Sequence, residues 1–492
     1  MKVGLQNKTA SSDFLTFLPC FLSTAVVLWA SALPLVLSAA VTPSDATTIA
    51  PVFSLNNHAP STFLRRAGLA THETYPPPTS DPFYAPPSDY HRKPNGAVLK
   101  SRNVTTAFDY LATTWQVLYK TTDAQGKADS TVTTLFRPHN PVSPPKVMLY
   151  FAPTNTARLD CETSFALLSP TFSDTSLVNI IDLSIALQKG WYVSVPDHEG
   201  SKSAFLSGVT EARAGLDGLR AMLAFDGLKE ELKEYDAVIR GYSGGGHEAA
   251  WATQYLSTYA KELKVAGAAA GGVPVDLYYT FDLVSGTPDV YLALTGLAGL
   301  ANAEPSLQRW LNSHTTPEGL AAVAYAQNSL ACLDSIASAD KPFPSDLYSY
   351  FEGGEESIRT GVFYEVFEKN RLGRKMKDGN KGVLPIPMFL HHSKTDGDAS
   401  YAPIRPYWRS QCAHGAKIHL ATTTGQTHVG AYLGYLADSY VFLQKAFDGT
   451  LGLDECKATD GVEYELLSAN YTAIIGDIAS KRVSDFVEET SG

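Results

Sequence analysis

Residues 237–252 read Ala-Val-Ile-Arg-Gly-Tyr-Ser-Gly-Gly-Gly-His-Glu-Ala-Ala-Trp-Ala, and this stretch decides the fold. A short apolar strand runs into Gly241-Tyr-Ser243-Gly-Gly245, and a helix-forming segment follows at once. Gly-x-Ser-x-Gly in this setting is typical of a sharp turn that exposes a serine hydroxyl. Only glycine fits at both ends of the turn, because a Cβ would collide with the neighbouring strand and helix. The pattern predicts Ser243 as a nucleophile, with the N–H of Gly244 directed at a developing oxyanion. The alternative is a glycine-rich turn that only links strand to helix.

The segments around this turn predict an α/β fold. Short apolar runs alternate with helical patterns such as residues 212–225 and 247–263, as in a doubly wound, mostly parallel sheet. Several of the runs are apolar on both faces, as strands covered by helices on both sides must be. Before them, residues 115–135 predict an antiparallel hairpin. The other predicted strands are residues 147–151, 191–195, 237–240, 265–270, 386–390 and 418–421.

One interval interrupts the alternation. A long, mostly helical stretch separates the fourth of these strands from the fifth, whereas a plain strand–helix–strand unit takes about thirty residues. We expect residues 275–381 to form a helical cap or lid over the carboxyl edge of the sheet, where ligands bind. The apolar and aromatic residues from Tyr278 to Leu300 favour an apolar substrate chamber, and a second, merely stabilising core is the alternative.

The two ends of the cap divide the remaining chain. The core is predicted to consist of residues 101–274 and 382–492, preceded by an extended, proline-rich arm at 41–100. Residues 1–40 are predicted to be a signal peptide, because an apolar run there ends in Ser-Ala-Ala, which signal peptidase accepts. An uncleaved anchor is the alternative. We therefore expect a secreted protein.

Composition narrows the partners and cofactors. The formal net charge is −11 and lysine and arginine form no cluster, which argues against nucleic acid as a partner. No Cys/His spacing indicates a metal site, and we expect no cofactor. Asn103 and Asn470 begin Asn-x-Thr sequences and are predicted glycosylation sites. An even number of cysteines in an oxidising compartment predicts two disulfide bonds with the connectivity left open. These cysteines are Cys161, Cys332, Cys412 and Cys456.

An activated serine needs a histidine base, and the base needs a carboxylate that orients it. In this fold class the acid follows a late strand and the histidine follows the last one. Asp396 and Asp398 follow the strand at 386–390. We expect Asp396 to be the acid because it lies closer to the strand end and precedes a glycine, although either aspartate could simply cap a turn. His428, in the loop after the last strand, is the predicted base.

The other histidines fit the role of base less well. His414 precedes the last strand, at the opposite end of the sheet, and His419 lies within that strand. His198 and His247 are interpreted as structural. A second oxyanion donor is expected in the loop after an early strand. Because Pro153 has no N–H, that donor is predicted to be Thr154 or Asn155.

With these residues placed, the chain resembles the fungal secretory lipase family over about residues 80 to 456. The resemblance implies an α/β-hydrolase fold with a lid-bearing cap, a Ser243–Asp396–His428 triad, and disulfides Cys161–Cys332 and Cys412–Cys456. Besides the serine motif, the matching stretches are Asp81-Pro-Phe-Tyr84, Gly96-Ala-Val-Leu-Lys-Ser-Arg102, Asp197-His-Glu-Gly200, Gln411-Cys-Ala-His-Gly-Ala416 and Lys445-Ala-Phe-Asp-Gly-Thr450.

The chain departs from the family pattern near the expected oxyanion site. The family usually carries an acidic residue before Asp160, whereas residues 152–157 contain no carboxylate. After Cys161 the sequence is Glu-Thr-Ser-Phe, where Ala-Pro-Ser-Tyr is common. Both changes border the acyl site, so substrate or rate could differ from those of a fat-splitting lipase.

These features predict a secreted serine carboxylic-ester hydrolase, a lipase or esterase that works through an acyl-enzyme. Its expected substrates are lipid esters such as triacylglycerols, met at a lipid–water interface by a monomer. One alternative is a short-chain esterase or deacetylase acting on a fungal secondary metabolite. An acyltransferase on the same fold and a carrier without activity are the others.

Overall fold

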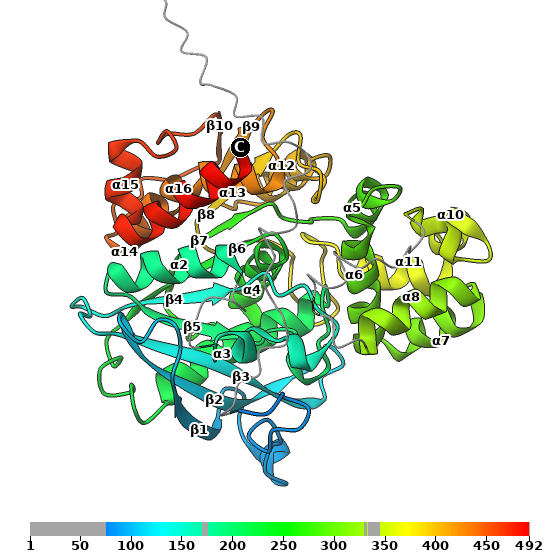
Figure 1. Cartoon of the computed structure of the whole chain (residues 1–492), viewed down its shortest axis with the longest axis horizontal. Helices are drawn as coiled ribbons and strands as arrows, with labels where there is room; N and C mark the ends of the chain where they lie inside the picture. Colours follow the sequence, from blue (N-terminus) through cyan, green and yellow to red (C-terminus); the bar gives the residue numbers. More distant parts are fainter. Residues whose placement is uncertain (1–74, 170–175, 329–331, 333–344, 492) are drawn as a thin grey trace, which may run out of the picture. The chain divides into compact units, whose positions relative to one another are not determined.

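One sheet of ten strands organises the described chain (Figure 1). The computed structural model describes residues 75–169, 176–328, 332 and 345–491, all within the unit Val52–Gly492. The predicted signal peptide and the first part of the arm lie outside these residues. The strands are β1 (Val98–Val104), β2 (Ala112–Thr122), β3 (Ala128–Pro138), β4 (Lys146–Phe151), β5 (Tyr192–Pro196), β6 (Asp236–Tyr242), β7 (Val265–Gly271), β8 (Met388–Ser393), β9 (Ile418–Thr423) and β10 (Lys457–Asp460).

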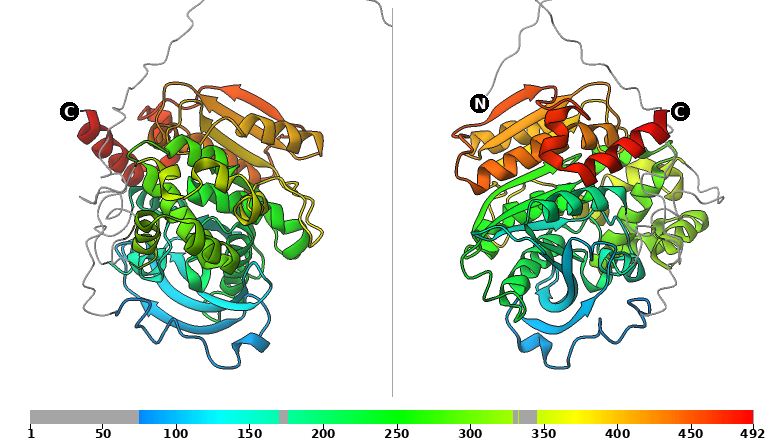
Figure 2. Two further views of the ribbon diagram at one scale, coloured as in Figure 1. Left: turned by 90° about the vertical axis from the view of Figure 1, so that its right-hand side faces the viewer. Right: turned by 60° about the vertical axis from the view of Figure 1, so that its left-hand side comes forward.

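The sheet has an antiparallel edge and a parallel remainder. Its order is β1-β2-β3-β5-β4-β6-β7-β8-β9-β10. Strand β2 pairs antiparallel with β1 and with β3, β3 pairs antiparallel with β5, and every later pairing is parallel. The colours in Figures 1 and 2 accordingly run from blue at one edge to orange and red at the other. This is the predicted α/β architecture, and it brings the carboxyl ends of β4 to β9 to one edge.

Helices cover both faces of the sheet because its strands are apolar on both faces. In β4, Val147, Leu149 and Phe151 pack in one core with helices α3 and α4, whereas Met148 and Tyr150 pack in a second core with α2 and α14. The helices are α1 (Thr163–Ala166), α2 (Leu177–Gln188), α3 (Gly208–Ala224), α4 (Gly244–Tyr259), α5 (Leu277–Val284), α6 (Val290–Ala303), α7 (Pro305–His314), α8 (Pro317–Asn328), α10 (Gly354–Ile358), α11 (Gly361–Lys369), α12 (Ile404–Ala413), α13 (His428–Gly434), α14 (Leu436–Phe447), α15 (Ala469–Ile475) and α16 (Asp477–Ser491).

Helices α5 to α11 follow β7 and precede β8 in the sequence. They lie together in space and have a hydrophobic core of their own (Figure 1). Phe281, Leu294 and Leu297 are almost completely buried in this core, which also contains Phe205 and Leu206 from the loop after β5. The residues that suggested an apolar substrate chamber therefore pack against one another and fasten the helical segment to the sheet. This corresponds to the alternative interpretation, a second core.

Two strands were not predicted, and both are polar. Strand β1 begins within the stretch expected to be an extended arm, and all four residues of β10 are exposed. The arm packs on β1 through the ion pair of Arg102 with Asp81 (2.7 Å) and cation–π contacts to Tyr75 and Phe83. Among the described residues, no helix is long and apolar enough to cross a membrane.

Candidate active site

Ser243 lies in the sharp turn between β6 and α4, in a backbone conformation that side chains rarely adopt. Its φ is 59° and its ψ is −126°. A Cβ at Gly241 would lie 1.9 Å from the carbonyl oxygen of Gly245, and one at Gly245 would lie 2.1 Å from that of Phe151. The two glycines thus let the first turn of α4 approach both β6 and β4, as the sequence pattern predicted. Strain of this kind is found where a fold fixes a functional side chain.

His428 and Asp396 form a buried hydrogen bond at the carboxyl edge of the sheet. The Nδ1–H of His428 donates to Oδ2 of Asp396 at 2.8 Å. The other oxygen of Asp396 accepts the backbone N–H groups of Asp398 (2.9 Å) and Ala399 (2.8 Å), which fixes the carboxylate. Of the two candidate acids, Asp396 is therefore the one bonded to the histidine. Nε2 of His428 is buried and has no hydrogen-bond partner, so it is available to a substrate or to a nucleophile.

The His428 ring lies beside the serine turn. Tyr242, which precedes Ser243, packs against the ring at a tilt of 45° with centroids 4.9 Å apart, and its hydroxyl donates to the His428 carbonyl at 2.5 Å. A Cβ on Gly272 would lie 2.6 Å from Cε1 of His428, and the preceding residue, Gly271, accepts the N–H of Ser243 at 2.9 Å. The three predicted residues, Ser243, Asp396 and His428, are thus brought to one place from three separate connections.

The surrounding carboxylates favour a charged imidazole. Burial lowers the pKa of His428, but the charge and hydrogen bond of Asp396 and the charges of Asp398 and Asp289 outweigh burial and raise the pKa to about 9. Burial raises the pKa of Asp396, but the interaction with His428 outweighs burial and lowers that pKa below its usual value. Asp289 stands at the N-terminus of α6, so the helical segment brings charge to the site. Nothing in the sequence marked this residue.

The loop after β4 brings Asn155, but not Thr154, to the serine turn. The N–H of Thr154 donates to the carbonyl of Ala152 at 2.8 Å, and its hydroxyl lies 2.6 Å from that of Thr163. Asn155 has a φ of 51° and a buried side chain whose Oδ1 has no hydrogen-bond partner. A Cβ on Gly244 would lie 1.9 Å from this Oδ1, so the amide of Asn155 faces the residue that follows the serine.

The remaining predicted residues lie away from this site. His414 is exposed at the end of α12, and His419 bonds the Thr459 hydroxyl at 2.8 Å on β10. His198 and His247 are fully buried beside α4. Asn103 and Asn470 are exposed, as glycosylation acceptors must be, and glycosylation of either stays a prediction.

Two disulfide bonds join Cys161 to Cys332 and Cys412 to Cys456.

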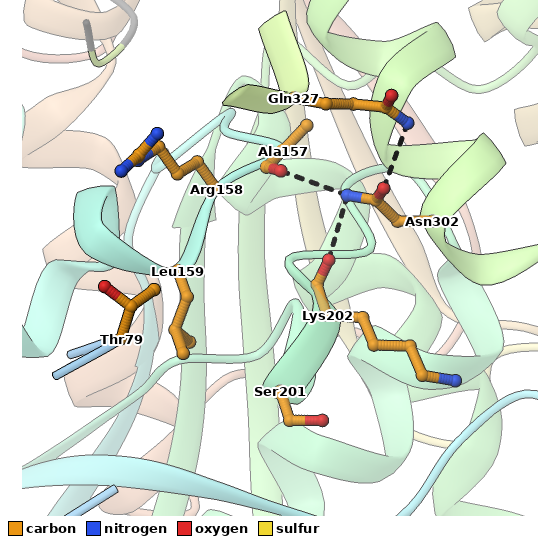
Figure 3. A pocket seen from close by; sticks show the side chains of 8 residues that line it. All are labelled: Thr79, Ala157, Arg158, Leu159, Ser201, Lys202, Asn302 and Gln327. Atoms are coloured by element: carbon orange, nitrogen blue, oxygen red, sulfur yellow. Dashed lines mark hydrogen bonds between the residues drawn. The ribbon is translucent and has the colours of Figure 1, made fainter. Parts of the chain in front are cut away.

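A polar pocket lies where the helical segment meets the loop after β4 (Figure 3). Its volume is about 520 Å³. Asn302 joins its two sides, because its Nδ2 donates to the carbonyls of Ala157 (3.0 Å) and Lys202 (2.9 Å). The described residues that line it are Thr79, Ala157, Arg158, Leu159, Ser201, Lys202, Asn302 and Gln327. None of the candidate catalytic residues is among them, so this pocket is distinct from the serine site.

Comparison with known proteins agrees with this arrangement. The sequence model of the family described as "Secretory lipase" matches residues 169–454. Lipase A of Moesziomyces aphidis is 32% identical over 398 residues, which cover 80% of this chain and 84% of that protein. The secreted triacylglycerol lipase LIP4 of Malassezia globosa is 31% identical over 412 residues, covering 81% and 88% of the two chains.

A solved structure extends the similarity to the fold. Candida antarctica lipase A in its closed state superimposes with a TM-score of 0.76 and 29% identity, covering 83% of this chain and 95% of that one. The family match spans more than half of the chain. The chain therefore belongs to the secretory lipase family and is a secreted carboxylic-ester hydrolase with the α/β-hydrolase fold.

Proposed function

We propose that the chain hydrolyses lipid esters, triacylglycerols among them, through an acyl-enzyme formed on Ser243. The observation that carries the proposal is the His428–Asp396 hydrogen bond of 2.8 Å beside the strained serine turn, with Nε2 of His428 left without a partner. The Malassezia globosa relative, named as a secreted triacylglycerol lipase, favours triacylglycerols as the substrate class.

In the first half of the reaction, the Ser243 hydroxyl attacks the ester carbonyl while Nε2 of His428 takes its proton. Asp396 accepts the Nδ1–H, holds the ring in the tautomer that leaves Nε2 free, and stabilises the imidazolium that forms. The imidazolium then gives its proton to the leaving alcohol, and the acyl group stays on the serine oxygen. Water repeats these steps on the acyl-enzyme and releases the fatty acid.

The tetrahedral oxyanion needs donors that are in place before the reaction. We propose the backbone N–H of Gly244 and the side-chain amide of Asn155 in this role. The amide is buried and is held by a backbone with positive φ; its unbonded Oδ1 faces Gly244 in the resting protein, and a 180° turn of the amide brings the donor Nδ2 to this place. An asparagine keeps two N–H donors at every pH, whereas a carboxyl group at this position could donate only when protonated. Thr154 is not proposed, because its N–H is already bonded to Ala152.

The test is hydrolysis of a p-nitrophenyl ester series from acetate to palmitate, together with emulsified triolein, by the secreted protein and by Ser243→Ala. The proposal expects activity on long-chain esters and triolein and a loss of several orders of magnitude in the variant. Cleavage confined to acetate and butyrate would replace the lipase assignment with a short-chain esterase. Full activity in Ser243→Ala would refute the nucleophile itself.

A further inference from the structure

Three fully buried side chains behind the serine turn each leave at least one polar atom without a hydrogen bond. His198 and Glu199 follow β5, and Glu248 lies on α4, five residues after Ser243. One nitrogen or oxygen from each of the three lies within 4.8 Å of the others. Nε2 of His198, Oε2 of Glu199 and both carboxylate oxygens of Glu248 have no hydrogen-bond partner. Polar atoms buried this completely are almost always bonded, so these require an explanation.

The proton on His198 lies on the nitrogen that faces away from the cluster. Its Nδ1 is 3.1 Å from the carbonyl of Pro196, which can only accept, so Nδ1 carries the hydrogen. The other ring nitrogen, Nε2, lies 2.6 Å from Oε2 of Glu248, with no hydrogen bond between the two atoms. Two atoms this close, each with a lone pair toward the other, need a positive centre between them, which is either a proton or a metal ion.

Among the described residues, no lysine or arginine supplies this centre. None of the described lysines or arginines forms an ion pair with Glu199 or Glu248. The neighbouring charges that act on these two carboxyl groups include Glu211 and Asp197, which are acidic and fully buried themselves. The charged form of this buried acidic group is unfavourable without a counter-charge, so its carboxyl groups either keep protons or bind a cation.

We propose that His198, Glu199 and Glu248 bind a divalent transition-metal ion, with Zn²⁺ as the best match. A neutral imidazole nitrogen with two carboxylates is a ligand set that zinc accepts, whereas Ca²⁺ and Mg²⁺ prefer oxygen alone. Zinc–ligand distances of about 2.0–2.2 Å place tetrahedral ligand atoms about 3.3 Å apart. The present separations are 2.6 Å between His198 and Glu248 and at most 4.8 Å within the group, so small side-chain shifts reach this value.

The hydrogen bond of His198 to Pro196 has the form expected around a bound metal. Metal-ligating histidines usually donate the second ring N–H to a carbonyl or carboxylate, which fixes the tautomer and the direction of the ring. The site is structural, because it is sealed from solvent and has no room for a substrate. Its effect reaches the serine site through Glu199, whose Oε1 accepts the N–H of Thr156 at 3.2 Å, one residue after Asn155.

The test is the metal content of the purified full-length secreted protein. After saturation with Zn²⁺ and exhaustive dialysis in metal-free buffer, elemental analysis is expected to find about one Zn²⁺ per folded chain. Removal of the ion by a strong chelator should lower the thermal midpoint by several degrees, and Zn²⁺ should restore it. These measurements do not depend on ester hydrolysis, so they stand even if the proposed substrate is wrong.

Variants locate the ion. His198→Gln and Glu248→Gln should each reduce Zn²⁺ below about 0.1 per chain. His247→Gln is the matched control, since this buried histidine precedes Glu248 on the same helix but has Trp251 and Glu211 as partners of its two nitrogens. It should keep the ion. Folded parent protein that retains no Zn²⁺ and gains no thermal stability from it would overturn the proposal and leave a proton as the bridge. Zn²⁺ retained by both ligand variants would also overturn it.

Discussion

Replacing Asn155 by glycine should slow ester hydrolysis by about 10²–10³-fold, because one donor to the oxyanion is lost. The perturbation is specific for two reasons. Asn155 has a φ of 51°, and glycine adopts this conformation without strain, so the loop should keep its course. The side chain is buried and its Oδ1 bonds to no other group, so its removal breaks no hydrogen bond made by that oxygen in the resting protein.

The expected loss of rate equals the transition-state stabilisation that one pre-positioned hydrogen-bond donor contributes in a site closed to water. Removal of one donor costs about 2.7–4 kcal/mol of transition-state stabilisation, which is the rate factor above. Because the oxyanion exists only in the transition state and the tetrahedral intermediate, the loss should appear in kcat and leave KM nearly unchanged. Gly244→Ala is expected to have a related effect, since its Cβ would lie 1.9 Å from Oδ1 of Asn155 and push the amide away.

The assay is steady-state hydrolysis of a soluble p-nitrophenyl ester, with circular dichroism to establish that each variant is folded. Thr154→Val is the matched control in the same loop. Its N–H bonds to Ala152 and its hydroxyl to Thr163, so kcat should stay within about threefold of the parent. A folded Asn155→Gly protein with nearly unchanged kcat would refute the assignment. A large loss in Thr154→Val would transfer the role to Thr154.

Three further predictions concern pH and stability. His428 must be neutral to accept a proton, and its pKa is about 9. Below pH 9, kcat/KM should therefore decrease about tenfold for each pH unit. A kcat/KM that is already constant above pH 7 would contradict this. The Cys412–Cys456 disulfide closes a loop of 44 residues, so the double serine variant should lose about 4 kcal/mol in denaturant unfolding, and an unchanged midpoint would count against it. Asp182 and Arg240 form an ion pair of 3.0 Å with no solvent exposure, so Asp182→Ala should cost about 3–5 kcal/mol, with thermal unfolding as the measurement.

The central sheet could be predicted because its strands carry the signal on both faces. The apolar residues of β4 pack alternately into two cores, and a short apolar run between turn residues is typical of such a buried strand. Strand β10 had no such signal. Its residues Lys457–Asp460 are all exposed, and only pairing with β9 makes them a strand. An edge strand of this kind depends on its partner, and the partner is distant in sequence.

The apolar residues of the helical segment show a second limit. From Tyr278 to Leu300 the sequence is rich enough in apolar residues to line a chamber or to fill a core, and composition does not separate the two. In the structure, α6 approaches the loop after β5 so closely that a Cβ on Gly299 would lie 2.6 Å from the backbone of Phe205. The apolar face of α6 is therefore buried against this loop. Whether the apolar face of a helix lines a cavity or belongs to a core depends on which other elements cover it, and this is decided by the tertiary structure.

The residues with positive φ around the serine show which backbone conformations a local sequence pattern predicts and which it does not. Ser243 was recognised because glycines at fixed spacing are the condition for its turn. Asn155, Ser203 and Leu206 also have positive φ, at 51°, 47° and 65°, yet no sequence pattern marks them. Their conformations cost free energy locally and persist only because packing from several elements over-determines them. The His198 cluster is likewise not marked by the sequence. Asp197-His-Glu-Gly200 matches the family pattern, but the free lone pair on Nε2 depends on Nδ1–H donating to the Pro196 carbonyl and on Glu248 approaching from α4. A site formed by residues from separate elements can be recognised in the three-dimensional structure but not in the sequence.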